Sequence, residues 1–302
     1  MTAPPDFLAQ QFEDNRARLR GVAYRLLGSM AEADDAVQEA WLRLSRADAS
    51  AIGNFSAWLT TVVSRICLDQ LRARAARREV ALEGAPARAV PAPRRDPEQE
   101  AALADAVGLA LLVVLDRLAP AERLAFVLHD LFALSFAEIA AILGRSPQAA
   151  RQLASRARRR VRGGTPLQPA PLGGHRRLVE AFLAALHAGD LNAALAVLDP
   201  EFEVIGDGAG AGDGKIRGAH AWAMQAMTYR AGVRFTRVVL VDGEIGAVFA
   251  PGGRLARVLR FTFAAGRIRS MEVVADPARL RALALALPGH AVVDTPPGNP
   301  VA

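Results

Sequence analysis

Apolar residues recur every three or four positions through most of the first half of the chain, which is the spacing of one helix face. Glycine and proline interrupt this pattern between successive segments. The pattern predicts helices over residues 6–28, 30–44, 56–79, 105–117, 120–131 and, as a closely spaced pair, 134–162. Two proline-rich stretches, 80–100 and 163–174, lack the period and are predicted to be linkers.

The helix pair within 134–162 is the most strongly specified part of this pattern. Gly144 can adopt a positive φ at the end of the first helix, and Ser146 with Pro147 can open the second. The buried face of the second helix is predicted to hold Ala150, Leu153, Ala157 and Val161. The opposite face is predicted to hold Gln148, Gln152, Ser155 and Arg159, flanked by Arg151 and Arg156. The pattern favours a helix-turn-helix that binds a polyanion over an ordinary solvated helix pair.

The predicted secondary structure changes from all-helical to mixed helices and strands from residue 175 onward. Residues 175–187, 190–198 and 218–227 are predicted to be helices, and 201–206 a strand. Four β-rich runs follow between residues 233 and 275, separated by turn signals such as Asp242-Gly243. Helices followed by an antiparallel meander predict an α+β domain with its helices against a curved sheet, closed by a short helix at 276–287.

These elements predict a multidomain protein with two all-α domains followed by one α+β domain. The expected domains are 6–79, 101–162 and 175–287, with linkers at 80–100 and 163–174 and a disordered tail at 288–302.

Composition adds a preference for anionic partners. The chain of 302 residues carries a formal charge of +6, and six of the twelve residues from Arg151 to Arg162 are arginine. Lys215 is the single lysine, and Cys67 is the single cysteine, which excludes an intramolecular disulfide and a cysteine-based zinc site. No stretch is long and apolar enough for a membrane span or a signal peptide. We expect a soluble cytoplasmic protein that does not contact membranes.

Two charged helix faces are candidate contact surfaces. Asp34, Asp35, Gln38 and Glu39 fall as two i,i+4 pairs on the helix at 30–44, where they form a solvated face or meet a basic partner helix. Five arginines gather in the second half of the helix at 56–79, more than the helix dipole needs, which suggests phosphate contacts. They are Arg65, Arg72, Arg74, Arg77 and Arg78.

With these residues assembled, the chain resembles the extracytoplasmic-function (ECF) group of the bacterial sigma-70 family. Residues 19–44 and 55–79, with the segments DDAVQEAW and AWLTTVVSR, look like sigma domain 2, and residues 115–161 look like sigma domain 4. Residues 175–276 resemble the SnoaL-like (NTF2-like) extension of the SigJ-like branch. The Trp-Leu-Pro-Glu-Pro linker motif of that branch is absent from 80–100.

The resemblance implies an alternative sigma factor that binds core RNA polymerase, through its clamp helices and flap, and promoter DNA. Asp34, Asp35, Gln38 and Glu39 would bind the clamp helices. The minus-10 element would meet Trp58, Ser64, Arg65, Asp69 and Arg72, although Trp58 could equally be a buried anchor. The minus-35 element would meet Gln148, Arg151, Gln152, Ser155 and Arg156, with Arg159 placed to neutralise phosphate.

The C-terminal domain allows more than one interpretation. NTF2-like folds form a cone whose open end can hold a small apolar ligand, and some relatives are enzymes. The candidate acid–base residues are Asp199, Glu203, Asp207, His187 and His220, but no spacing selects a pair among them. The loop GDGAGAGDGK resembles a regulatory motif of the branch at Asp213, Gly214 and Lys215. It could be a plain surface loop, a contact to the sigma domains or, with little support from its spacing, a nucleotide site.

Three functions remain open at this point. The first is a sigma factor, not an enzyme, whose fused C-terminal domain modulates it in cis, with no cofactor, no metal and no separate anti-sigma factor. The second is a ligand-sensing helix-turn-helix regulator that acts without core polymerase. The third is a SnoaL-like enzyme with an accessory DNA-binding module.

Overall fold

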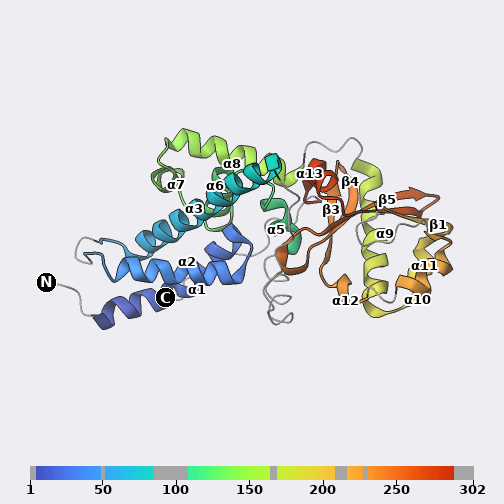
Figure 1. Ribbon diagram of the computed structural model, residues 1–302, viewed down its shortest axis with the longest axis horizontal. Helices are drawn as coiled ribbons and strands as arrows, with labels where there is room; N and C mark the ends of the chain where they lie inside the picture. Colours follow the sequence, from blue (N-terminus) through green and yellow to red (C-terminus); the bar gives the residue numbers. More distant parts are fainter. Residues whose placement is uncertain are drawn as a thin grey trace. The chain divides into compact units, whose positions relative to one another are not determined.

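Regular structure up to Arg162 is helical throughout the described part of the chain (Figure 1). The computed structural model describes residues 5–48, 52–84, 108–163, 169–207, 216–226 and 230–288. The helices are α1 (Pro5–Leu27), α2 (Met30–Leu44), α3 (Phe55–Gly84), α5 (Leu109–Leu115), α6 (Pro120–Phe126), the π-helical turn η2 (Val127–Leu131), α7 (Phe136–Leu143) and α8 (Pro147–Arg162). This order confirms the all-α first half that the apolar period predicts.

Two helix boundaries before residue 190 differ from the prediction by five residues or more. Helix α3 continues to Gly84, because residues 80–83 are mostly good helix formers and the glycine is the first strong stop signal. Helix α9 (Pro169–Ala188) begins inside the predicted linker 163–174, since proline is tolerated in the first turn of a helix. The rest of the linker 80–100, the loop 208–215 and the tail from 289 lie outside the described residues.

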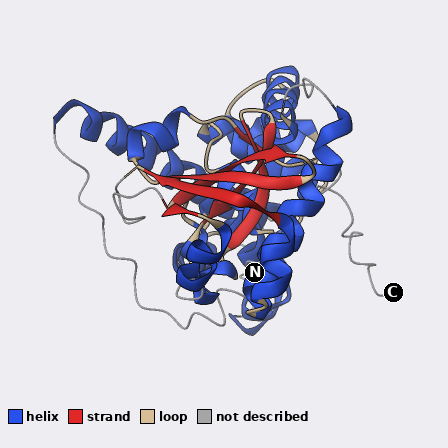
Figure 2. Ribbon diagram, turned by 90° about the vertical axis from the view of Figure 1, so that its right-hand side faces the viewer, coloured by secondary structure: helices blue, strands red, loops and turns tan. Residues whose placement is uncertain are grey.

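The second half of the chain forms a mixed sheet (Figure 2). Seven strands lie in the order β2-β1-β6-β5-β4-β3-β7. They are β1 (Leu198–Gly206), β2 (Ile216–Arg217), β3 (Thr236–Val241), β4 (Glu244–Phe249), β5 (Arg257–Ala264), β6 (Arg267–Val274) and β7 (Leu285–Ala286). Strands β1 and β6 are parallel, and the other neighbours are antiparallel. The predicted α+β class is therefore confirmed, with one parallel pair in addition to the expected meander.

Helices cover one face of this sheet around an aromatic cluster. Helices α9, α10 (Leu191–Val197) and α11 (Ala219–Ala226) contribute most of the helical side of the cluster. The Phe182 ring stacks on Trp222 with centroids 5.2 Å apart and meets Phe261 of β5 edge-on at 6.1 Å. All three side chains are at most 5% exposed, so this cluster is the core of the α+β domain.

The opposite face of the sheet is also partly buried. Val248, Val258 and Val274 pair directly across β4, β5 and β6, so they share a face, and each is 0% exposed. Helix α5 contacts β3 and the short 3-10 helix η4 (Pro251–Gly253). Its apolar residues Leu109, Leu112, Val113, Val114 and Leu115 are at most 1% exposed. An element from the helical half of the sequence therefore packs against the sheet.

The segment predicted as a helix over 276–287 is only partly helical, so this prediction was wrong. Helix α13 (Pro277–Ala282) ends early, and Leu285–Ala286 then pair with Leu240 and Val241 of β3. The free edge of β3 offers unpaired backbone groups, and hydrogen bonding to that edge replaces the last helical turn.

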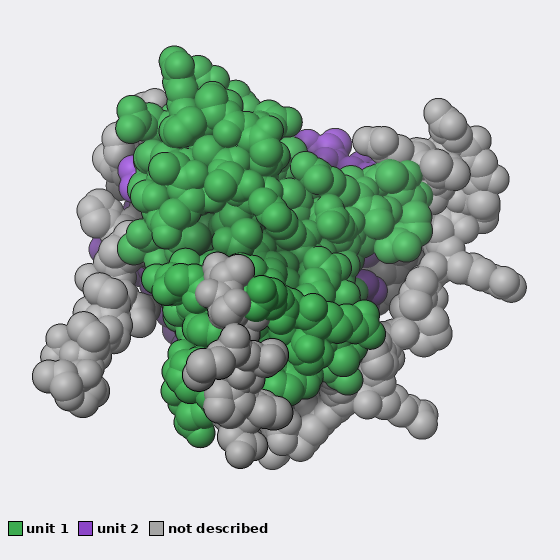
Figure 3. All heavy atoms as spheres, turned by 90° about the vertical axis from the view of Figure 1, so that its left-hand side faces the viewer, with its two compact units in different colours: residues 1–96, 118–158 green, residues 97–117, 159–302 purple. Residues whose placement is uncertain are grey.

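The chain divides into two compact units that do not follow the order of the sequence (Figure 3). Unit 1 comprises residues 1–96 and 118–158, and unit 2 comprises residues 97–117 and 159–302. Helix α5 and the last residues of α8 thus belong with the sheet. The sequence predicted three domains in chain order, so it did not predict that α5 and the last residues of α8 belong with the sheet.

Candidate nucleic-acid interface

The helix pair α7 and α8 is fixed by local hydrogen bonds at the start of each helix. Ser135 and Glu138 form a reciprocal capping box at the start of α7: the Glu138 N–H donates to Ser135 Oγ, and the Ser135 N–H donates to Glu138 Oε2. Gly144 adopts φ 64° at the end of α7, as its sequence position predicts. Ser146 Oγ accepts the Ala149 N–H at 3.2 Å and opens α8. These bonds confirm the predicted helix-turn-helix.

Helix α8 has one buried face and one exposed face. Its buried side chains are Ala150, Leu153, Ala154, Ala157 and Val161. The six side chains predicted to contact the minus-35 element all lie on exposed positions: Gln148, Arg151, Gln152, Ser155, Arg156 and Arg159. The structure therefore brings these residues together on one side of a single helix.

The arginines of α8 have different partners within unit 1. Arg156 Nε donates to Glu122 Oε1 at 3.1 Å, and that glutamate side chain is only 7% exposed. Arg158, which was not among the predicted DNA contacts, donates from Nε to Asp130 Oδ1 at 2.6 Å. Charge-assisted bonds of this kind occupy N–H donors that could otherwise bind phosphate or a base edge.

Helix α3 presents most of the residues predicted for the minus-10 element. Arg65, Asp69 and Arg72 are exposed, and Trp58 is half-buried. Ser64 differs, because its side chain is 0% exposed and its hydroxyl has no hydrogen-bond partner among the described residues. Its place in the helical repeat aligns it with a buried stripe, which consists of Thr60, Cys67, Leu68 and Leu71. Ser64 therefore cannot contact a ligand at the α3 surface in this conformation, which corrects its inclusion among the surface candidates.

Arg65 is already engaged within unit 1. Its guanidinium donates to the backbone carbonyl of Ala141 in α7 at 2.9 Å. Arg123 of α6 makes a second long-range contact, donating from Nε and Nη2 to the carbonyl of Arg25 at 3.3 and 3.2 Å. Arg123 is 2% exposed, so a buried guanidinium links α6 to the end of α1.

The acidic face of α2 is exposed as expected. Asp34 pairs with Arg20 of α1 at 2.6 Å, and Glu39 pairs with Arg43 one turn later at 3.0 Å. Asp35 and Gln38 lie between them on exposed positions. Exposed pairs of this kind contribute roughly 0–1 kcal/mol to stability, so the face is available to a partner at little cost.

The candidate acid–base residues of the α+β domain do not converge on its core. Asp199 and Glu203 are each paired with an arginine at 2.7 Å, Arg269 and Arg217 respectively. The Glu201 N–H and the Arg269 guanidinium hold the pKa of Asp199 below its usual value. The two histidines, His187 and His220, are exposed. In the described residues beyond Pro169, Thr236 is the one buried polar side chain.

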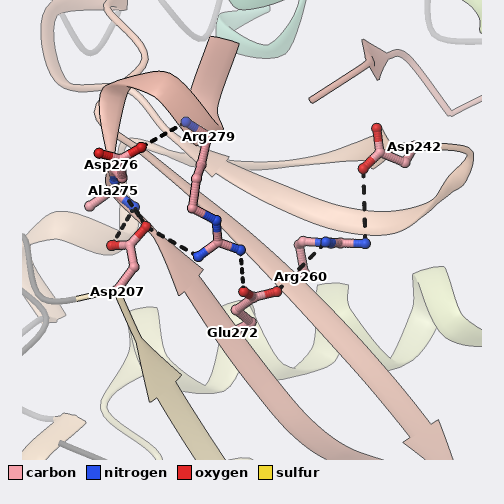
Figure 4. Close-up of polar contacts among 7 residues, drawn as sticks. All are labelled: Asp207, Asp242, Arg260, Glu272, Ala275, Asp276 and Arg279. Atoms are coloured by element: carbon pink, nitrogen blue, oxygen red, sulfur yellow. Dashed lines mark hydrogen bonds and ion pairs between the residues drawn. The ribbon is translucent and has the colours of Figure 1, made fainter. Parts of the chain in front are cut away.

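Asp207 instead holds the start of helix α13 (Figure 4). Its carboxylate accepts the backbone N–H groups of Ala275 and Asp276 at 3.0 Å and lies 3.4 Å from Arg279 Nη1. Burial alone would raise the pKa of Asp207, but these two N–H donors and the Arg279 charge together lower it. Figure 4 also shows Arg279 bound to Glu272, so α13 is tied to β6 as well as to the end of β1.

The other end of α13 binds a residue from the helical half of the sequence. Arg117, which follows α5, donates to the backbone carbonyl of Leu280 and, at 3.2 Å, to that of Arg281. A guanidinium at a helix C-terminus satisfies carbonyls that the helix leaves unpaired and complements its dipole. The predicted regulatory residues Asp213, Gly214 and Lys215 lie outside the described residues, directly before β2 in the sequence.

Comparison with known families agrees with this geometry. Residues 11–77 match Sigma-70 region 2, and residues 108–161 match Sigma-70 region 4. These two regions define a sigma-70-type transcription factor. The ECF RNA polymerase sigma factor SigJ of Mycobacterium tuberculosis is 38% identical, covering 88% of this chain and 91% of its own. The probable ECF sigma factor SigI of the same species is 35% identical, covering 94% of this chain and 98% of its own.

The chain therefore belongs to the ECF RNA polymerase sigma factor family. A crystal structure of Mycobacterium tuberculosis SigJ is 36% identical and covers 90% of this chain and 98% of its own, with a TM-score of 0.45. The family consists of transcription initiation factors without enzymatic activity, which work with core RNA polymerase and promoter DNA. None of the helices in the described ranges has the length and apolar character needed to cross a membrane.

Proposed function

We propose that this sigma factor recognises the minus-35 element with α8 and the minus-10 element with α3. The observation that supports the first assignment is the exposed polar face of α8, opposite a fully buried face and anchored by a capped turn. Glutamine and arginine at Gln148, Arg151 and Gln152 carry donors that match base edges in the major groove. On α3 the corresponding candidates are Trp58, Arg65, Asp69 and Arg72.

The acidic face of α2 is the proposed contact with the clamp helices of core polymerase. Asp35 and Gln38 would make the central contacts, with Asp34 and Glu39 at the sides after exchange of their arginine partners. The test is reconstitution of the full chain with core enzyme and measurement of promoter-specific transcription. Failure to bind core enzyme at low salt would overturn the assignment.

Arg151 and Arg159 should respond differently to replacement by alanine. Arg151→Ala is expected to change preference at one or two minus-35 positions, costing about 1–3 kcal/mol for a lost bidentate contact. Arg159→Ala is expected to weaken binding evenly across sequences and to lower the salt slope by about one, because it would neutralise a phosphate. Binding of reconstituted polymerase to a set of minus-35 variants over a salt series measures both effects. Equal behaviour of the two variants would contradict the assignment of faces.

We further propose that the C-terminal domain modulates promoter activity in cis through α13. Support comes from the two ends of this helix: Asp207, beside the loop 208–215, binds its start, and Arg117, beside α5, binds its end. A change in the loop could therefore reach the region 4 segment through a single short helix. A small apolar ligand bound in the cone would contact the same sheet.

Two substitutions at opposite ends of α13 should alter transcription in the same direction. Arg117→Ala and Asp207→Ala each remove hydrogen bonds to a charged group, which contribute roughly 1.5–3 kcal/mol, so output should change by about tenfold to a hundredfold. Asp199→Ala is the matched control, because its described hydrogen-bond partners, Glu201 and Arg269, lie outside α13. Transcription with core enzyme, alongside chains ended after residues 165 and 205, measures the effect. Unchanged output from both variants would remove the proposed route.

The other two functions have less support. An acid–base enzyme would need a poised titratable group in the domain core, whereas the described carboxylates Asp199 and Asp207 have lowered pKa values and arginine partners. A regulator that acts without core polymerase would not require the acidic face of α2.

A further inference from the structure

We propose that Phe136 is a positioning residue for minus-35 recognition, because its ring holds the guanidinium of Arg151. This inference rests on the proposed role of Arg151 in contacting base edges. It adds a determinant of sequence preference that would not itself touch DNA.

Phe136 lies at the centre of a three-membered stack in unit 1. The His129 ring stacks on it with centroids 4.0 Å apart and an interplanar angle of 25°. Arg151 Cζ lies over the same ring, 5.3 Å from its centroid. Since the imidazole occupies one face of the phenyl ring, the guanidinium must use the other.

Local hydrogen bonds hold His129 and the backbone around Phe136 in place. His129 Nδ1 lies 2.8 Å from the Leu134 carbonyl oxygen, which can only accept, so the proton is on Nδ1. Phe136 is the first residue of α7 and follows Ser135, whose capping box with Glu138 fixes that turn. The ring that meets Arg151 therefore has little freedom to rotate away.

The contact leaves the donors of Arg151 available. A guanidinium bound to a carboxylate occupies its N–H groups, as Arg156 does with Glu122 and Arg158 with Asp130. A guanidinium over an aromatic face is attracted through its charge and keeps its in-plane N–H groups free for the acceptors of guanine. An unrestrained arginine side chain would instead lose more rotamer freedom on binding. Phe136 thus both restrains Arg151 and preserves its hydrogen-bonding capacity.

The test compares base preference at each minus-35 position with polymerase reconstituted from the full chain. Phe136→Leu keeps most of the volume but removes the aromatic face, and Phe136→Tyr keeps that face. We expect Phe136→Leu to reduce discrimination about twofold to fivefold at the positions that Arg151→Ala affects, and at no others. Phe136→Tyr should restore it. In the Arg151→Ala background, Phe136→Leu should have no further effect on discrimination.

Several outcomes would overturn the inference. A uniform loss of activity across all minus-35 sequences, or an equal effect of Phe136→Leu with and without Arg151, would indicate a merely structural role. If Arg151→Ala changes preference and Phe136→Leu does not, the inference fails while the assignment of Arg151 stands. If Arg151→Ala leaves preference unchanged, both fail. Phe136→Met serves as a second flexible apolar replacement if the leucine variant does not fold.

Discussion

Replacing Arg123 by alanine is expected to lower the free energy of unfolding of unit 1 by about 2–5 kcal/mol, the range for removing a large, fully buried side chain. Arg123 is 2% exposed and donates twice to the partly buried Arg25 carbonyl, which would lose its charged donor. Because α6 belongs to region 4 and α1 to region 2, the loss should also loosen the packing of the two regions.

Tryptophan fluorescence during urea unfolding can isolate this effect. Trp41 and Trp58 lie in unit 1, whereas Trp222 lies in unit 2, so a Trp222→Phe background makes the signal report unit 1 alone. Arg145→Ala is the matched control, because Arg145 is exposed. Equal unfolding midpoints for the Arg123 and Arg145 variants would show that the buried guanidinium contributes little.

Ending the chain after residue 165 is expected to release helix α5. The helix has only seven residues, too few to be stable alone, and its apolar side chains are buried in a unit that contains the sheet. Exposing even two such side chains costs roughly 3 kcal/mol, so amide exchange in residues 109–115 should accelerate about a hundredfold. Arg117 would lose its carbonyl partners at Leu280 and Arg281 at the same time.

Hydrogen-exchange mass spectrometry of the full and shortened chains measures this directly. Peptides from α2 serve as the internal reference, because α2 lies in unit 1 and should exchange at the same rate in both chains. Unchanged protection of residues 109–115 would mean that the sheet is not what stabilises α5. Since α5 lies within the region 4 match, its release would also connect loss of the C-terminal domain to promoter recognition.

The helix-turn-helix could be predicted because its determinants are close in sequence. Ser146, Gly144 and the apolar period of α8 act within one or two helical turns, and each has a preferred backbone geometry. The family resemblance, by contrast, placed Ser64 beside Arg65 near the DNA, but neighbours in a helix point about 100° apart. Helix α3 packs with the stripe that contains Ser64 buried and leaves Arg65 exposed.

The sequence alone determined the helical first half, the α+β second half, the two faces of α8 and the resemblance to ECF sigma factors. The helices, the strands and the two faces of α8 depend on periodicity, capping and local charge, which act between residues a few positions apart. The resemblance depends on the segments DDAVQEAW and AWLTTVVSR. The tertiary structure decided which distant segments share a unit: α5 with the sheet, Arg123 with the end of α1, and Arg117 with α13. Arg117 and Leu280 are 163 residues apart. No local pattern encodes such a contact, because it exists only after both elements have packed.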